Sequence, residues 1–319
     1  MRRAVMLAVA AGLMAVPAAA QVPGRAAGHV VRPGDDGQSP VRGIRVVLHR
    51  VGLLQQGPVD TVETDAQGAF RFRFALDTAA SYLVSANYAG IEYFSQPLSR
   101  DPVRPDTAVQ VVVFDTSSTA PVALRNRTIV IGSPDPLGNR TVIDWLAIEN
   151  RGRVTRVEED SLDPTWSAPL PPEARNPVLG DAAISRISPD ALIFRNDSVG
   201  LIAPVSPGAK EILLQYEITA DSRELTLETA GADSAEVFLE ERSARVPTAG
   251  WVTRDSQLFE GRSFLRVQRG AGADNRLVVR FPRTTPARWM LPLLVAGTAL
   301  LLAALAWWRL RRPIQTRPT

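Results

Sequence analysis

His29 and His49 are the only imidazoles of this 319-residue chain, and it has no cysteine. A Ser-His-Asp triad would have to use one of them as its base. Both lie in predicted strands with arginine nearby, where a histidine is usually an edge or solvent-face residue. Without cysteine there is neither thiol chemistry nor a disulfide. Paired acids can act without a signature, but no carboxylate motif points to a hydrolase. We therefore predict no catalytic residue and no enzyme.

Two acidic segments are similar to calcium-binding loops, namely Asp35-Asp36-Gly37 and residues 65–68. Neither has a third acidic ligand or the closing bidentate glutamate of such a loop. Aspartate can accept bonds from its own backbone and glycine adopts positive φ, so both segments are predicted to be turns, and residues 65–68 are expected to form a tight hairpin turn. We expect no metal and no cofactor.

Four aromatic side chains are the candidate contact residues: Tyr88, Tyr93, Phe94 and Trp166. The first three flank Gly90, where two short strands could turn, and aromatics beside a turn can form a platform for a sugar ring or a peptide. The alternative is that they close a sandwich core. Trp166 lies in an irregular, proline-rich stretch, and an exposed tryptophan there would indicate a partner surface.

The remaining pattern is that of β-strands. In residues 70–74 three phenylalanines alternate with two arginines, and residues 212–218 alternate in the same way. Such a period of two places one set of side chains in a core and the other in solvent, as in antiparallel sheets. No segment between the two ends of the chain sustains a helical period.

A composition change predicts the domain boundary. Residues 109–114 form a predicted buried strand, and 115–121 are a polar linker closed by proline, so we divide the exported part into domains 21–116 and 117–285. Residues 163–189 are predicted to be irregular, and a loop of that length is functional or mobile. The strands predicted for the second domain are 122–131, 141–148, 191–194, 212–218, 225–227, 237–239, 264–267 and 277–281.

The two ends of the chain predict its topology. Residues 1–20 have the charged, apolar and small-residue order of a secretory signal peptide, with cleavage expected after Ala20. Residues 289–308 have no charge and begin and end in tryptophan, and twenty residues are long enough to span a bilayer. The arginines that follow place the tail, 309–319, in the cytoplasm. We expect a single-pass protein of the cell membrane.

Charge excludes nucleic acid as a partner. The chain has 36 basic and 33 acidic residues, but six arginines lie in the signal and tail segments, which leaves the exported part at 30 against 33, a net −3. A nucleic-acid footprint needs a clustered basic face. Lys210 is the only lysine, which we interpret as codon bias in a GC-rich bacterium.

Three short motifs carry a family resemblance. They are Gly-His-Val-Val at 28–31, Pro-Val-Arg-Gly-Ile-Arg-Val at 40–46 and Thr-Asp-Ala-Gln-Gly-Ala-Phe at 64–70. Together they resemble the carboxypeptidase regulatory-like, transthyretin-like domain over residues 27–114. The resemblance implies a seven-stranded β-sandwich, frequent in exported bacterial proteins and related in architecture to starch-binding-like modules.

A peptidase activity does not follow from this resemblance. Some members accompany a zinc peptidase domain, whose metal needs His and Glu ligands. Neither His29 nor His49 is followed by a His-x-x-Glu spacing.

The sequence therefore predicts an all-β protein of two β-sandwich-like domains plus one C-terminal transmembrane helix. Its expected role is non-enzymatic binding or structural interaction at the bacterial envelope, with an envelope protein or a polysaccharide as partner. A carbohydrate-binding module and an accessory factor that docks another membrane protein remain the alternatives.

Overall fold

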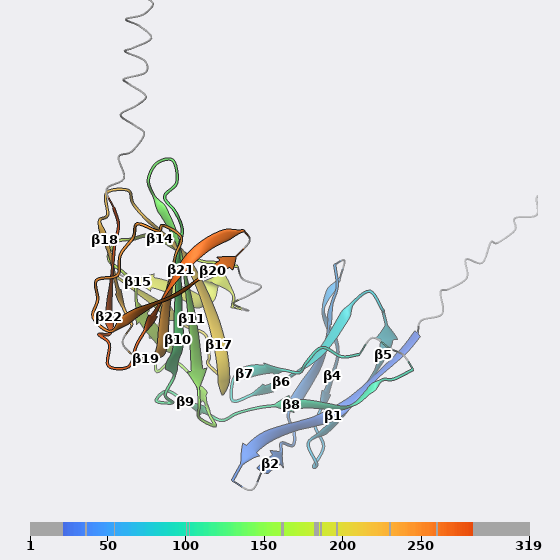
Figure 1. Cartoon of the computed structure of the whole chain (residues 1–319). Helices are drawn as coiled ribbons and strands as arrows, with labels where there is room; N and C mark the ends of the chain where they lie inside the picture. The colour runs from blue at the N-terminus through green and yellow to red at the C-terminus, as the bar shows by residue number, and fades with distance from the viewer. Residues whose placement is uncertain are drawn as a thin grey trace, which may run out of the picture. The chain divides into compact units, whose positions relative to one another are not determined.

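The computed structural model describes residues 22–282, apart from 36, 54, 100, 102, 161–162, 182–184, 186, 196, 230 and 260. These residues are mostly β-strands, and no helix among them is long and apolar enough to cross a bilayer. The predicted signal peptide and the predicted membrane span lie outside the described residues. The chain divides into two compact units, Met1–Asp115 and Thr116–Thr319, which we call unit 1 and unit 2 (Figure 1).

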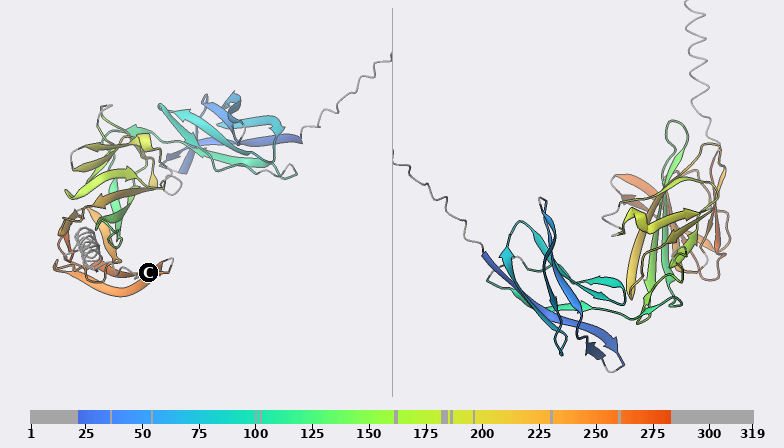
Figure 2. Two further views of the ribbon diagram at one scale, coloured as in Figure 1. Left: turned by 90° about the horizontal axis from the view of Figure 1, so that it is seen from above. Right: turned by 180° about the vertical axis from the view of Figure 1, so that it is seen from behind.

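Unit 1 is a sandwich of two four-stranded sheets (Figure 2). In one sheet β1 pairs with β2, β5 and β8, and the other has the order β4-β3-β6-β7. The strands are β1 (Val22–Gly34), β2 (Gly37–Pro40), β3 (Arg45–Val51), β4 (Gln56–Glu63), β5 (Ala69–Leu76), β6 (Ser81–Tyr88), β7 (Ile91–Phe94) and β8 (Asp106–Val112). The resemblance implies seven strands. The eighth strand is the short β2, which follows a turn before Gly37 and pairs antiparallel with the end of β1.

Alternate side chains fill the space between the two sheets. Phe70 and Phe72 of β5 are buried and Phe74 is half-buried, whereas Arg71 and Arg73 are exposed, as the period-two pattern predicts. Buried Leu48, Tyr82 and Val84 from the opposite sheet share one hydrophobic core with these phenylalanines.

Two predicted turns connect these strands in different ways. At residues 65–68 the Asp65 carboxylate accepts from the amides of Gln67 and Ala69, and Gly68 has φ +70°. We expected a hairpin there, and this was wrong, because β4 and β5 belong to different sheets. The turn at Ala89 and Gly90, both with positive φ, does join a paired hairpin, β6 and β7.

Unit 2 contains a seven-stranded sheet of order β14-β17-β11-β10-β19-β21-β20. Its pairs are antiparallel except for β10 and β19, which run parallel. The strands of this sheet are β10 (Ala123–Ile131), β11 (Arg140–Asn150), β14 (Ala174–Leu179), β17 (Gly208–Ile218), β19 (Ala232–Leu239), β20 (Trp251–Phe259) and β21 (Arg262–Arg269). Each of the eight strands predicted for this part of the chain is present in unit 2.

Smaller sheets cover one face of the seven-stranded sheet and complete the core. The shared core includes Ile212 and Leu214 from the large sheet, Leu201 from a three-stranded sheet, and Leu225 and Val279 from a two-stranded one. These smaller strands are β13 (Trp166–Pro169), β15 (Leu192–Arg195), β16 (Ser198–Leu201), β18 (Glu224–Glu228) and β22 (Arg276–Arg280), and a further pair is β9 (Thr116–Ser117) with β12 (Thr155–Arg156).

The predicted irregular segment 163–189 contains two strands, so that prediction was wrong. The prolines of this segment interrupt the strand pattern in the sequence. Pro169 ends β13, an edge strand, and Pro177 lies in β14 where the register against β17 shifts. Edges and bulges are the places in a sheet where a residue without an amide hydrogen is tolerated. Trp166 is consequently a buried strand residue.

Candidate ligand pocket and polar clusters

The outer face of sheet β4-β3-β6-β7 carries polar side chains from three neighbouring strands. Even-numbered residues of β3, such as Leu48, point into the sandwich, so His49 points outward. On β6 the buried Val84 alternates with outward-facing Ser85. Glu92 of β7 is exposed on the same outer face.

Strand register brings these side chains together. Asn87 lies directly opposite Glu92 across the β6–β7 pair, and Ser85 lies opposite Phe94. His49 is opposite Leu83 in the β3–β6 pair, so Ser85 is its diagonal neighbour. Directly opposed and diagonal side chains are those that can interact on one face of a sheet.

Hydrogen bonds link the three strands through one carboxylate. Ser85 Oγ donates to Glu92 Oε1 and lies 2.8 Å from His49 Nε2, and Asn87 Nδ2 donates to Glu92 Oε2 at 3.1 Å. A hydroxyl has a single proton, so with that proton directed at Glu92, His49 Nε2 must act as a donor to Ser85. This assigns the Nε2–H form of the ring. Both oxygens of Glu92 are thereby held in place.

A hollow of 430 Å³ lies above this chain of bonds. We call it the outer-face pocket and define it by its lining residues, Arg45, Val47, His49, Pro58, Asn87 and Glu92. Arg45 is exposed and forms no ion pair within the described residues. The ring of Phe94, 58% exposed, has its centre 6.0 Å from that of His49, one of the lining residues. The pocket combines donors and acceptors with the apolar side chains of Val47 and Pro58, which is the composition of a small-ligand site.

Ser85 is not placed as a nucleophile. Its side chain is fully buried and its proton is directed at Glu92 rather than at His49. In a serine triad the histidine accepts the serine proton. These hydrogen bonds instead hold the side chains of Glu92 and His49 in one orientation, with their polar groups facing the pocket.

The four aromatic candidates have different environments. Phe94 is exposed beside His49, whereas Tyr93 is buried and donates its hydroxyl to the Phe114 carbonyl at 3.0 Å. Tyr88 is half-buried and donates to Asp115 at 2.6 Å, the first of the contacts that raise its pKa. Trp166 is buried in the core of unit 2. Tyr93 and Trp166 are thus mostly enclosed by the protein, although Trp166 also lines a hollow of 310 Å³ in unit 2. The sequence did not identify Ser85, because a small residue within a strand has no distinctive pattern.

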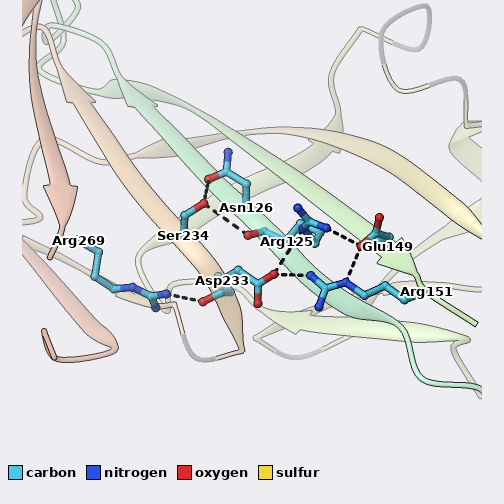
Figure 3. Close-up of polar contacts among 8 residues, drawn as sticks. Arg125, Asn126, Glu149, Arg151, Asp233, Ser234 and Arg269 are labelled. Carbon is cyan, nitrogen blue, oxygen red and sulfur yellow. Dashed lines mark hydrogen bonds and ion pairs between the residues drawn. The ribbon is translucent and has the colours of Figure 1, made fainter. Parts of the chain in front are cut away.

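A second polar cluster lies on unit 2 (Figure 3). Arg125 binds Glu149 at 2.7 Å and Asp233 at 3.4 Å, and Arg151 binds the same two acids at 2.7 and 2.6 Å. We call these four residues the ion-pair ring. Hydrogen bonds from Arg151 and then Arg125 lower the pKa of Glu149. Each charge already has two partners of opposite sign, so few donors and acceptors of the ion-pair ring remain for a ligand.

A buried ion pair lies within the core of unit 2. Arg127 and Asp144 are almost completely buried, and the guanidinium binds the carboxylate through Nε at 3.0 Å and through its NH2 group at 2.5 Å. The other terminal nitrogen of Arg127 donates to the Glu228 carbonyl at 2.6 Å. Multiple bonds of this kind are what make a buried charge tolerable.

Comparisons with known proteins give little further information. No protein-family model matches the sequence, and no curated protein matches it. Among solved structures, an M1 zinc metallopeptidase mutant from Deinococcus radiodurans bound to a Tyr-Ser-Ala substrate aligns with TM-score 0.30 and 12% identity, over 50% of this chain and 42% of that one. Another structure of the mutant peptidase gives 0.29 and 13%, over 53% and 44%. The chain thus spans less than half the length of these proteins, and similarities this weak do not indicate a function.

Proposed function

We propose that this chain is a non-enzymatic binding protein of the bacterial envelope, anchored by residues 289–308, and that the outer-face pocket binds a saccharide. The pocket lies within residues 27–114, the part that resembles the carboxypeptidase regulatory-like domain. The proposal therefore favours the carbohydrate-binding alternative, with Phe94 as the member of the aromatic set that contacts ligand.

The observation that carries the proposal is the fixed orientation of Glu92. A carboxylate has about four acceptor positions, and Ser85 and Asn87 occupy one on each oxygen. The remaining positions can accept from sugar hydroxyls, while Arg45 donates to them. The ring of Phe94 supplies an apolar surface for a sugar ring.

The lining of the pocket also supports binding rather than hydrolysis. Glycosidases use two carboxyl groups that flank the scissile bond. Glu92 is the one carboxylate among the residues that line the outer-face pocket. Ser85, whose hydroxyl donates to Glu92, is buried.

Titration calorimetry of the detergent-solubilised full chain tests the proposal, with maltoheptaose and soluble peptidoglycan fragments as probes. Glu92→Gln and Phe94→Ala should each weaken binding of the responding probe by about tenfold or more, because a good polar contact or a stacked ring contributes on the order of 1.4 kcal/mol. Phe194→Ala, which removes an exposed ring from unit 2, is the matched control. Unchanged affinity in both pocket variants, or no binding of either probe, would contradict the proposal.

Reporter fusions test the membrane topology. Alkaline phosphatase joined after Arg283 should be active, and the same enzyme joined after Pro318 inactive, because only the first would lie outside the cytoplasm. The reverse pattern would overturn the proposed location of both units.

One observation favours the docking alternative. The seven-stranded sheet exposes Ile143, Trp145 and Val178, although sheet faces in contact with water are normally polar. Trp145→Ser should abolish co-purification of a membrane partner if this face docks one. Co-purification of the same partner with the variant would exclude this face.

A further inference from the structure

The end of unit 2 at which β22 finishes must lie close to the membrane if residues 289–308 span it. Seven peptide steps separate Pro282, where the described chain ends, from Trp289. Even fully extended they cover about 25 Å, and the headgroup layer itself is roughly 5–7 Å thick. This inference rests on the proposed membrane span.

Strand register places two hairpin turns at this end. Ile131, Leu239 and Leu265 form one row across β10, β19 and β21. Beyond that row, β10 continues into the loop 132–139, the green loop at the top of unit 2 in Figure 1. The turn that joins β20 to β21 lies beyond the same row. We call this the exit end.

Side-chain contacts tie the exit end to the last described residues. Arg140, at the start of β11, lies over the ring of Phe281 with its guanidinium carbon 4.3 Å from the ring centre. The amide of Phe281 donates to the Arg223 carbonyl at 2.9 Å. Ala220 donates to the side chain of Asn139 at 3.2 Å, which joins the loop 132–139 to the same corner. The loop 132–139 and the last described residues therefore lie at the same corner of unit 2.

Exposed apolar side chains stand at the tips of both hairpins. Leu137 is 62% exposed in the loop 132–139, and Leu258 and Phe259 are 72% and 48% exposed where β20 ends. Leu137 and Leu258 are the two most exposed large apolar side chains among the described residues of unit 2. Large apolar groups at loop tips are costly in water and are favourable at a lipid interface.

Three arginines of the exit end are not used in ion pairs with the residues that the structure describes. Glu224, Glu240 and Glu241 are paired with Arg280, Arg262 and Arg140. The Asp135 carboxylate accepts from the amides of its own loop. Within the described residues, Arg223, Arg242 and Arg245 have no acidic partner within ion-pair distance, and the acids Glu173, Glu217 and Asp221 at this end form no ion pair either. The three arginines therefore have no counter-ion within the described part of the chain.

We propose that the exit end of unit 2 rests on the membrane surface. Leu137 and Leu258 enter the headgroup layer, and Arg223, Arg242 and Arg245 bind the phosphates of acidic lipids. Exposed apolar side chains and unpaired arginines at one end of the unit match the combination of hydrophobic and electrostatic attraction that holds proteins at an anionic interface. Unit 2 is then held against the membrane surface and is not connected to it by the chain alone.

Single-cysteine labelling tests this, because the native chain has no cysteine. Leu137→Cys is labelled with an environment-sensitive fluorophore in the full chain, reconstituted in vesicles of phosphatidylcholine and phosphatidylglycerol. The control is Ala271→Cys, exposed in the loop before β22 and therefore at the opposite end of that strand. A headgroup-linked quencher should reduce emission at position 137 at least about twofold more than at 271, because only an interfacial residue lies within the headgroup layer.

The outcomes separate the two proposals. Vesicle flotation after a carbonate wash reports on the span, and failure to float would remove both the span and the docking. Flotation with equal, weak quenching at positions 137 and 271 would overturn the docking alone. Arg223→Gln, Arg242→Gln and Arg245→Gln together should reduce quenching at 137 in acidic vesicles, and an unchanged signal would reject the assigned role of these arginines.

Discussion

In the ion-pair ring of unit 2 every charge contacts two opposite charges, whereas Arg45 in the outer-face pocket of unit 1 forms no ion pair within the described residues. Both sites combine arginine with at least one acidic residue on the outer face of a sheet. They differ in unused bonding capacity. A site whose donors and acceptors are all occupied by the protein stabilises the fold, and a site that orients its groups but leaves positions open can recognise a ligand.

The largest expected effect concerns the buried pair of unit 2. Arg127→Met should cost about 3–5 kcal/mol of unfolding free energy, because Asp144 is left buried without its counter-charge. Urea unfolding followed by tryptophan fluorescence measures this, since Trp145, Trp166 and Trp251 all lie in unit 2. The double variant Arg127→Met, Asp144→Leu should recover much of the loss. A double variant as unstable as the single one would show that packing, not charge, is lost.

A second large effect should separate the core of unit 1 from its pocket. Phe72→Ala should cost about 3–5 kcal/mol, because a buried ring leaves a cavity, while the neighbouring exposed Arg71→Ala should change stability by less than about 0.5 kcal/mol. Hydrogen exchange of residues 22–115 in the full chain measures both. Glu92→Gln should resemble Arg71→Ala. If it were as damaging as Phe72→Ala, the pocket would be part of the stabilising framework and the comparison would fail.

A smaller effect should appear at high pH. Burial, with Asp144 nearby, raises the pKa of Tyr216 well above its ordinary value of 10.0. The unfolded tyrosine ionises as the pH rises past that ordinary value while the folded one stays protonated, so this stability is present below about pH 10 and is lost above it. Tyr216→Phe should flatten the fall of the urea midpoint between about pH 10 and 11. An unchanged slope would mean that another group controls alkaline unfolding.

The smallest effect is expected in the ion-pair ring. Arg151→Ala should slightly lower the urea midpoint of unit 2 in low salt, because exposed pairs gain little and are screened by ions. The difference from the native chain should vanish at about 1 M salt, where the screening length is roughly 3 Å. A difference that persists at high salt would show that Arg151 acts through packing.

Alternation made much of the fold predictable. Residues 212–218 and 70–74 show which side chains are buried because a strand can bury only every second position, and the structure confirms both faces. Prolines produced the main error, since Pro169 and Pro177 break the strand signal while remaining compatible with an edge and a bulge. The parallel pairing of β10 with β19 leaves no trace in the sequence, because period two is the same for both strand directions.

The pocket was predictable only in part. Phe94 was identified because it is a large aromatic beside the Gly90 turn. His49, Ser85 and Glu92 come from three strands, and their meeting depends on the register of β3 with β6 and of β6 with β7. Register depends on long-range packing, so the spacing of these residues along the sequence does not predict the site.

The parallel pairing of β10 with β19 also sets an order of folding. Thr128 and Glu236, neighbours across this pair, are 108 positions apart in the chain. The β10–β11 hairpin can form as soon as its own residues emerge, but the other edge of β10 stays open until β19 has been made. Contacts between distant segments form slowly and leave strand edges unpaired in the meantime. For unit 2, the interval between the synthesis of β10 and the synthesis of β19 is a period in which the open edge of β10 can pair with a wrong strand.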